Sequence, residues 1–424
     1  MSTIKSSTTT TTAYSVEADT TGALVIQTGV TPTTALTVGS DQSVTFAGAV
    51  SLSGNQTTTG NLTVNGNTTL GDASTDTILM TGAPSIGGAG LGMGMGFRNR
   101  LINGGMGIAQ RGTSFTSGAN NDDAYVLDRF YILSDGNDAI DVTQTTTVPT
   151  GAKYSIGLDV ETTNKKFGIA QIIENANCFD AIGGNVTLSF QAKVSSTTKL
   201  DNVKCAIVAW SGTADTVTSD IISAWGAEGT NPTLIANATY ENTPANLNVT
   251  TSFATYSVTA NVDTASTANI IVFIWSDVTD TTAGDFLYVT NVQLEKGSTA
   301  TSFDYRPYGT ELQLCQRYYI QYLGNTLDEA LASGMSSTNQ NGFVVVALPV
   351  TMRSNPTLSY STVSLLRWSE LTNAFDGTAL GLDKASPKTP FIYISVASGM
   401  TSYRSGFITA NNSTSAYVGF SAEL

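Results

Sequence analysis

The chain contains no histidine among its 424 residues. Histidine is the general base that activates serine or cysteine in the common hydrolase triads, so those enzyme classes are excluded. Histidine-bearing zinc and non-haem iron sites are excluded as well. Only three cysteines occur, Cys178, Cys205 and Cys315, and no CxxC pair is present, so neither a disulfide framework nor a zinc knuckle is expected. We expect these cysteines to act as small buried hydrophobic residues.

Charged residues are also scarce, at 12% of the chain, which is about half of the usual share in soluble domains. The net charge is −14 and lysine and arginine form no cluster. We therefore expect no nucleic-acid partner and no binding to an anionic membrane. No run of about 18 apolar residues predicts a membrane span. Residues 1–22 lack the apolar core of a secretory signal, so we expect synthesis in a cytosol without signal-peptide export.

Residues 36–96 contain no lysine, arginine or glutamate and are built from short alternating units separated by Gly, Asn or Asp. Period-two apolar spacing predicts strands, and such clusters predict turns. One unit is too short to bury its own side chains, so we predict a fibre shaft that needs copies of itself. The residues expected to point inward are Leu62, Val64, Leu70, Val44, Phe46, Val50 and Leu52. Residues 1–35, with the run Thr8–Thr12, are predicted to be an anchor or a flexible segment.

Residues 97–310 are predicted to form one β-sandwich of the jelly-roll type. The strand at 185–194 alternates apolar and polar residues, whereas the strand at 269–275 is apolar throughout and should be buried on both faces. The expected strands are Gly168–Glu174, Asn185–Val194, Val203–Trp210, Phe253–Ala260, Asn269–Trp275 and Phe286–Leu294.

Residues 311–424 are predicted to form a second, smaller β domain at the tip, which makes the chain all-β. Its expected strands are Phe343–Val350, Thr357–Ser361, Phe391–Ala397 and Ala416–Ala422. The only helix candidates are residues 311–319, one turn running into a strand, and the short segment Leu327–Leu331.

Four aromatic residues are candidates for binding a sugar, because sugars stack on aromatic faces beside polar side chains. Trp225 and Tyr240 lie in loop-like sequence and are expected to be exposed. Trp210 and Trp275 end apolar strands. Packing in the core is the alternative role for all four residues.

Acidic pairs occur at Asp122–Asp123 and in the loop 135–141 (DGNDAID). A glycosidase needs two carboxylates at a suitable distance from each other in one cleft, and the sequence alone does not give that distance. The loop is rich in oxygen ligands but lacks the EF-hand spacing and its terminal glutamate. We expect no catalytic residue and no cofactor, with Ca²⁺ at this loop as the alternative.

Three segments resemble bacteriophage fibre and virion structural proteins. FRNRLINGGMGIAQRGTSF (97–115), followed by YVLDRFYI (125–132), is similar to the start of a domain common in that family, except that Phe130 stands where members often have tryptophan. VQLEKGSTATSFDYRPYGTELQLCQRYY (292–319) resembles the segment that ends this domain. VALPVTMRSNPTLSY (346–360) resembles a phage tip strand with a PVTMR signature.

The resemblance covers most of residues 36–360, because the shaft also resembles the GNLTVNGN repeats of the same proteins. It implies a homotrimeric fibre or spike whose sandwich looks like a carbohydrate-binding module. Arg111 and Arg306 lie in the family-like QRG and YRPY motifs, and we take both as structural residues that join the sandwich to its neighbours.

We therefore expect a phage fibre protein without enzymatic activity. In the virion it would be held by other virion proteins through its N-terminus. Three linked weak sites would attach it to a bacterial surface glycan. One alternative is a head fibre or capsid decoration without a receptor role. An alternative of another class is a polysaccharide depolymerase.

Overall fold

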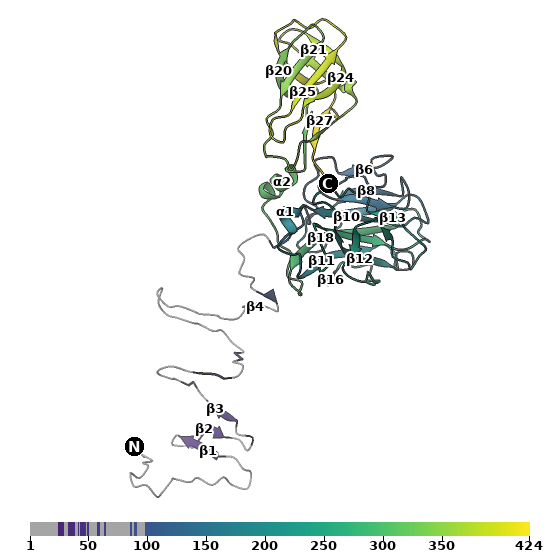
Figure 1. Cartoon of the computed structure of the whole chain (residues 1–424). Helices are drawn as coiled ribbons and strands as arrows, with labels where there is room; N and C mark the ends of the chain where they lie inside the picture. Colours follow the sequence, from purple (N-terminus) through teal and green to yellow (C-terminus); the bar gives the residue numbers. More distant parts are fainter. Residues whose placement is uncertain are drawn as a thin grey trace. The chain divides into compact units, whose positions relative to one another are not determined.

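The computed structural model describes residues 24–28, 33–38, 41, 43–47, 49–50, 57–59, 63–64, 85–86, 89–90 and 98–424. The chain divides into two compact units, Met1–Leu79 and Met80–Leu424 (Figure 1). In the described residues no helix is long and apolar enough to cross a bilayer.

The first unit contains a three-stranded antiparallel sheet of β1 (Leu24–Thr28), β2 (Thr33–Val38) and β3 (Val44–Phe46). Its apolar side chains are about half exposed, among them Val25, Ile26, Val44 and Phe46, and so are Val50 and Val64 further along. Leu52, Leu62 and Leu70 lie outside the described residues. The single chain therefore leaves these apolar groups uncovered, and their burial by copies of the chain stays a prediction.

The second unit contains a β-sandwich of two antiparallel sheets (Figure 1). The five-stranded sheet has the order β15 (Ala238–Tyr240), β12 (Val203–Trp210), β17 (Asn269–Ser276), β10 (Phe167–Ile173) and β7 (Tyr131–Ser134). The six-stranded sheet has the order β16 (Ala254–Asn261), β11 (Asn185–Val194), β18 (Phe286–Lys296), β9 (Ser155–Val160), β8 (Ile140–Thr145) and β6 (Ser114–Phe115). Shorter elements are β4 (Ser85–Ile86), β5 (Ala89–Gly90), α1 (Asn175–Cys178), β13 (Ile222–Ala224) and β14 (Thr233–Leu234).

Strand β17 is buried on both faces, which confirms that prediction. Ile270, Val272 and Ile274 face the core between the two sheets. Ile271 and Phe273 point the other way, into a second cluster on the outer face of the five-stranded sheet. A continuous apolar run is what a strand covered on both sides requires.

The outer face of this sheet is covered by residues 211–237 of the same chain, which we call the cover. Val217, Ile221 and Trp225 of the cover pack on this face. The cover is tied down by Lys166, which is fully buried and pairs with Asp277. Nζ of Lys166 also donates to the carbonyl oxygens of residues 227 and 230, at 2.7 and 3.3 Å.

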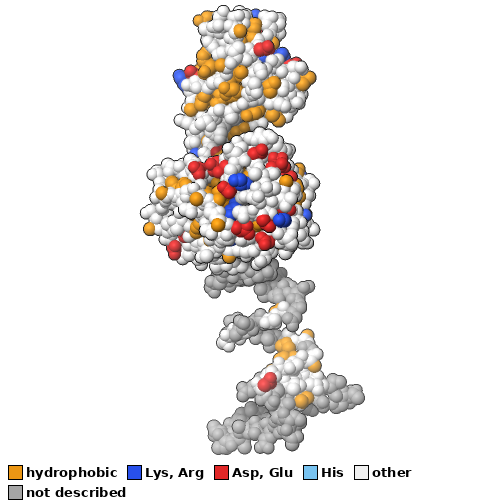
Figure 2. Space-filling view, turned by 90° about the vertical axis from the view of Figure 1, so that its right-hand side faces the viewer, with side chains coloured by type: hydrophobic (Ala, Val, Ile, Leu, Met, Phe, Trp, Pro, Cys, Tyr) orange, Lys and Arg blue, Asp and Glu red, His pale blue; other side chains and the backbone are white. Residues whose placement is uncertain are grey.

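The C-terminal part holds a closed six-stranded barrel in the order β20 (Ala330–Ser336), β21 (Asn341–Val345), β25 (Phe391–Val396), β24 (Ala374–Lys384), β23 (Leu366–Ser369) and β26 (Ser405–Ala410). Below it lies a sheet of β19 (Tyr319–Leu323), β27 (Tyr417–Ser421) and β22 (Thr357–Tyr360), with a short turn of helix, η1 (Val363–Leu365). Hydrophobic side chains are visible across the barrel, whereas acidic ones gather on the sandwich (Figure 2).

The barrel interior is built around Trp368, which is fully buried. Gly342 and Gly406 make room for its ring, because a Cβ atom at either position would lie 2.5 or 2.4 Å from ring atoms. Only glycine permits so close an approach to an aromatic ring inside a small barrel.

The two helix predictions have different outcomes. α2 (Tyr308–Gln316) begins earlier than expected and ends just before β19. The segment Leu327–Leu331 was wrongly predicted as helical: it forms a turn and then enters β20, where pairing with β26 satisfies the backbone. Apart from these boundaries, the expected all-β fold class is confirmed.

The end of the chain lies between the sandwich and the barrel part. Glu423 pairs with Arg129 and, at 3.1 Å, with Arg111. Arg129 is buried, with its guanidinium 3.6 Å from the ring centre of Tyr318. Tyr125 donates a hydrogen bond to the backbone oxygen of Leu424 at 2.6 Å. Buried ion pairs of this kind fix one arrangement, because separating them would leave desolvated charges alone.

Candidate functional site

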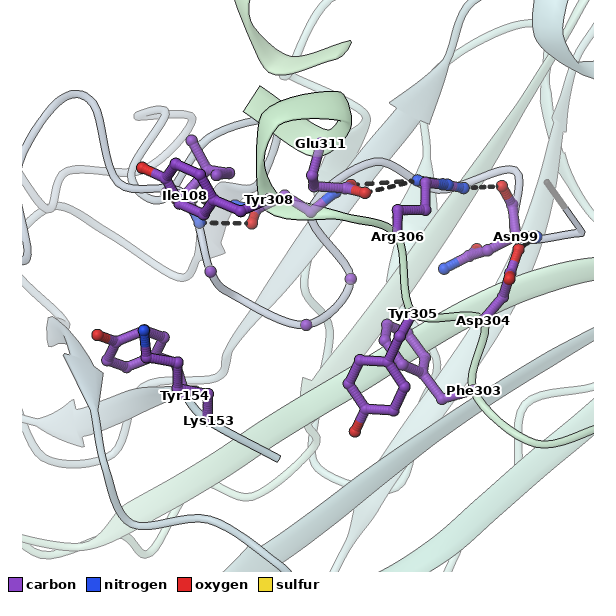
Figure 3. A pocket seen from close by; sticks show the side chains of 14 residues that line it. Asn99, Ile108, Lys153, Tyr154, Phe303, Asp304, Tyr305, Arg306, Tyr308 and Glu311 are labelled. Carbon is purple, nitrogen blue, oxygen red and sulfur yellow. Dashed lines mark hydrogen bonds and ion pairs between the residues drawn. The ribbon is translucent and has the colours of Figure 1, made fainter. Parts of the chain in front are cut away.

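A pocket of about 440 Å³ opens in the second unit (Figure 3). Three segments line it: the loop 99–108, residues 153–154 before β9, and residues 303–311, which run into α2. Its volume falls within the usual range of small-molecule sites. These segments are far apart in sequence and meet because β9 and β18 are neighbours in the six-stranded sheet.

Four aromatic side chains line the pocket: Tyr154, Phe303, Tyr305 and Tyr308. Tyr305 is 59% exposed and Tyr308 is 67% exposed, so their faces are available to a ligand. Phe303 and Tyr305 meet edge to face with ring centres 4.7 Å apart. In Figure 3, Tyr154 lies on one side of the pocket, and Phe303 and Tyr305 lie on the other.

The upper wall of the pocket is a polar frame around Arg306. Its guanidinium donates to the carbonyl oxygen of Leu101 at 3.0 Å and to both oxygens of Glu311 at 3.1 Å. It also donates to the carbonyl oxygen of Asn99, and Glu311 accepts the backbone N–H of Asn103. This network ties the loop 99–108 to the first turn of α2 (Figure 3).

The loop needs special backbone geometry to fit this frame. Asn103 has a φ of 61°, a left-handed conformation that asparagine tolerates better than most residues. Its side chain holds both the N–H and the carbonyl of Ile108, at 2.8 and 2.9 Å. Next to it, a Cβ atom on Gly104 would lie 2.0 Å from the carbonyl oxygen of Val292. The pocket is thus formed in advance by a rigid turn.

The charged side chains of the lining differ in whether another group of the protein pairs with them. Asp304 accepts the backbone N–H groups of Arg98 and Asn99, at 2.8 and 3.3 Å. Glu311 is engaged by Arg306 as described above. Lys153 is exposed, with its Nζ 5.1 Å from the ring centre of Tyr154. Asp304 and Glu311 are both engaged by other groups of the protein. The lining therefore offers a ligand aromatic faces and a cation rather than an acid–base pair.

The sequence-predicted aromatic residues lie elsewhere. Trp225 was expected to be exposed and is only 8% exposed. It lies in the cover and packs against Phe273 of β17. Trp210 and Trp275 are buried in the same cluster, the second stacked on Phe273 at 4.4 Å. These three indoles were wrongly proposed as sugar platforms, because the cover and the strands occupy both of their faces. Tyr240 is half-buried and donates its hydroxyl to the carbonyl oxygen of Pro232 at 2.8 Å.

The two arginines of the family-like motifs occupy different places. Arg306 forms the frame of the pocket. Arg111 lies with its guanidinium 3.6 Å from the ring centre of Tyr319 and pairs with Glu423. It therefore bridges the sandwich and the barrel part and does not line the pocket.

The acidic pair Asp122–Asp123 lies apart from the pocket. Burial, together with the neighbouring Asp122 and Asp220, raises the pKa of Asp123 to about 7. In the loop 135–141, Asp138 and Asp141 both accept hydrogen bonds from the amide of Asn120, at 2.8 and 3.0 Å. Within the part of the chain that the structure describes, no group of three or more acidic or cysteine side chains could hold a metal ion. The structure therefore adds no support for Ca²⁺ at this loop.

Apart from Arg306, which was expected to be a structural residue, the pocket residues were not singled out from the sequence. Phe303, Tyr305 and Tyr308 do lie in the family-like segment 292–319. Their close spacing beside Arg306, outside any predicted strand, is the signal that could have found them. Tyr154 and Lys153 give no such signal, because only the pairing of β9 with β18 brings them to the pocket.

No protein-family model matches the chain, and no curated protein matches it either. Among solved structures, the enzymatically active domain of tailspike protein 4 of bacteriophage CBA120 is similar over 47% of this chain and 22% of its own length, with 16% identity and a TM-score of 0.28. The chain thus spans less than a quarter of that tailspike domain.

Two further solved structures match over their whole length. A putative sugar binding protein from Bacteroides thetaiotaomicron is 13% identical, with 47% of this chain covered, 100% of the other and a TM-score of 0.28. The carbohydrate-binding module TmCBM61, solved with β-1,4-galactotriose, is 13% identical, with 47% and 99% covered and a TM-score of 0.25. At such identities and scores the similarity decides nothing about a ligand.

Proposed function

We propose that this protein is a fibre component of a bacteriophage virion that attaches to a bacterial surface glycan, and that it does so through the aromatic pocket without cleaving the glycan. The observation that carries the proposal is the pocket itself. It combines four aromatic side chains with a preformed polar frame. The virion setting rests on the sequence resemblance described above.

The pocket has the chemistry that a sugar requires. The apolar face of a pyranose ring packs on an aromatic side chain, and its hydroxyl groups need fixed polar partners at the rim. Tyr154 on one side and Tyr305 on the other supply faces, and Lys153 supplies donors. The frame around Arg306 holds these groups in place before a ligand arrives, which lowers the entropic cost of binding.

Self-association would complete the proposal. The half-exposed apolar side chains of β1 and β3 cannot be buried by one three-stranded sheet. Three parallel chains would cover them and would present three pockets on one fibre. Linked weak sites raise the overall affinity without any tighter single contact.

A second candidate function is a polysaccharide depolymerase, and Asp123 is the observation that favours it. A carboxyl group with a pKa near 7 beside a second carboxylate is a pattern found in glycosidases, where one acid is kept protonated. Asp122 and Asp123 are adjacent in sequence, however, and they do not line the aromatic pocket.

Binding of the fluorescently labelled full-length protein to a glycan array tests the proposal. Tyr305→Ala and Tyr308→Ala should each weaken binding, by roughly fivefold per site for a lost stacking contact of about 1 kcal/mol. Tyr403→Ala is the matched control, because Tyr403 is 77% exposed in the barrel part. Unchanged binding by both pocket variants would overturn the site. Shortening of the bound polysaccharide would replace adhesion by depolymerisation.

A further inference from the structure

The charge of the pocket points to one class of sugar. Its lining contains four charged side chains, Lys153, Arg306, Asp304 and Glu311. Arg306 and Glu311 neutralise each other, and Asp304 is held by two backbone N–H groups. For Lys153 the structure gives no ion pair within the described residues, only the contact with the ring of Tyr154.

We infer that the pocket selects a glycan with acidic sugar units, such as a uronate, whose carboxylate pairs with Lys153. This inference rests on the proposed function. The protein as a whole is strongly acidic, with a net charge of −14, so an anionic polymer is repelled by most of its surface. An accessible cation at the aromatic site therefore decides where such a polymer can bind.

The test is an array that pairs each uronate-containing oligosaccharide with the neutral hexose oligosaccharide of the same linkage. The full-length protein should bind the acidic member of a pair about two- to fivefold more tightly per site, as expected for a partly exposed ion pair. Lys153→Gln should remove this preference and retain binding to the neutral member. Lys193→Gln is the control, because Lys193 also lies over an aromatic ring, 5.0 Å from the ring centre of Tyr288.

The possible outcomes distinguish a failure of the charge inference from a failure of the proposed glycan binding. Equal binding to both members of every pair, or a preference that survives Lys153→Gln, would overturn the charge inference and leave glycan binding in place. Binding to no member of any pair would overturn the proposed function as well.

A second and independent inference concerns the outside of the barrel. Strands β25, β21, β20 and β26 are consecutive in its wall and contain no charged residue. The pairings Met335 with Phe343, Phe343 with Tyr393 and Val345 with Phe391 place these side chains on the outer face. The buried Val344 and Ile392 between them point inward. We call Met335, Phe343, Val345, Phe391, Tyr393 and Phe407 the apolar wall.

The apolar wall is exposed in the single chain. Met335 is 50% exposed, Val345 59% and Phe407 45%. Phe343 and Phe391 stack with ring centres 5.4 Å apart, which makes the surface continuous. Strands β23 and β24 on the other side of the barrel carry Arg367, Asp376, Asp383 and Lys384. The barrel is therefore amphipathic, with one uncharged half and one charged half.

We propose that the apolar wall packs against the same wall of other copies of this chain. An acidic protein repels its own copies, so a contact between copies is favoured where no charge lies. The chain also leaves apolar residues of β1 and β3 uncovered, which are further surfaces that copies would bury. Exposed apolar patches of this kind mark interaction surfaces in soluble proteins.

Thiol crosslinking of the full-length protein tests this contact. Met335→Cys should give covalent oligomers with a short bifunctional thiol reagent, whereas Thr378→Cys, an exposed position on the charged half, should give none. The native cysteines are all buried, and burial raises the pKa of Cys178 to about 11, so the parent protein should not react. Absence of crosslinked product from Met335→Cys, or equal yields from both variants, would overturn the proposal.

Discussion

The outer face of the five-stranded sheet and the outer wall of the barrel are both lined by large apolar side chains, yet they are covered in different ways. On the sheet, Ile271, Phe273 and Val208 are fully buried under the cover, residues 211–237. On the barrel, Val345 and Met335 point outward and are about half exposed. The first surface is completed within the chain, and the second is left open.

This difference shows that apolar content alone does not identify a core. Burial of a valine side chain is worth about 1.5–3 kcal/mol, so an uncovered apolar surface is a large unused source of stability. In the sandwich, the cover buries the apolar face of the sheet, and this burial stabilises the fold. We infer that the barrel gains a similar stabilisation when its apolar wall packs against other copies of the chain. The same account applies to β1 and β3 of the first unit.

The largest expected effect comes from placing a charge on each surface. Val208→Asp buries a carboxylate under the cover and should destabilise the sandwich by at least about 4 kcal/mol. Val345→Asp should change the stability of the isolated fold by no more than about 0.5 kcal/mol but should weaken self-association. Tryptophan fluorescence during denaturation follows both variants, since three tryptophans lie in the sandwich and Trp368 lies in the barrel. Similar losses of stability in both would show that the apolar wall is covered within one chain.

A smaller effect should follow when the cover is released from the sheet. Lys166→Met removes the cation that holds the carbonyl groups of residues 227 and 230, and leaves Asp277 paired with Lys204 alone, at 2.6 Å. Breaking such a buried pair costs about 3 kcal/mol. Limited proteolysis should then cut within residues 211–237 at an increased rate.

The adjacent Lys165→Met is the matched control for this experiment. Lys165 is partly exposed and lies 3.9 Å from Asp135 at the surface, so its loss should change stability by less than about 1 kcal/mol. If the two variants were cleaved at the same rate, the cover would not depend on Lys166.

The smallest expected effect is on the pH dependence of the sandwich. Burial raises the pKa of Asp123 to about 7 and that of Asp159 to about 6, above the ordinary aspartate value of about 3.9. The folded state therefore holds protons that the unfolded chain has released, and stability is lost as the pH rises through this window. The unfolding free energy should be higher at pH 5 than at pH 8, and Asp123→Asn should reduce the difference. A pH profile unchanged by Asp123→Asn would show that this carboxyl group is ionised in the folded protein.

The strands were predictable where alternation or continuous apolarity is strong, as in β11 and β12, whose observed bounds match the prediction. The cover was not predictable, because Trp225 lies in loop-like sequence that contains two glycines and is buried only by long-range packing. Leu327–Leu331 looked helical by composition, but it forms a turn whose last two residues begin β20 of the closed barrel. The pocket depends on the meeting of residues 153–154 with residues 303–311, a contact set by sheet order rather than by any local pattern.

Apolar surfaces that one chain leaves open should be covered by other copies of the chain. Multi-angle light scattering of the native full-length protein at micromolar concentration tests this most directly. We expect a mass of three chains, and a shift toward smaller species in Val345→Asp. A stable, folded single chain at that concentration would contradict it.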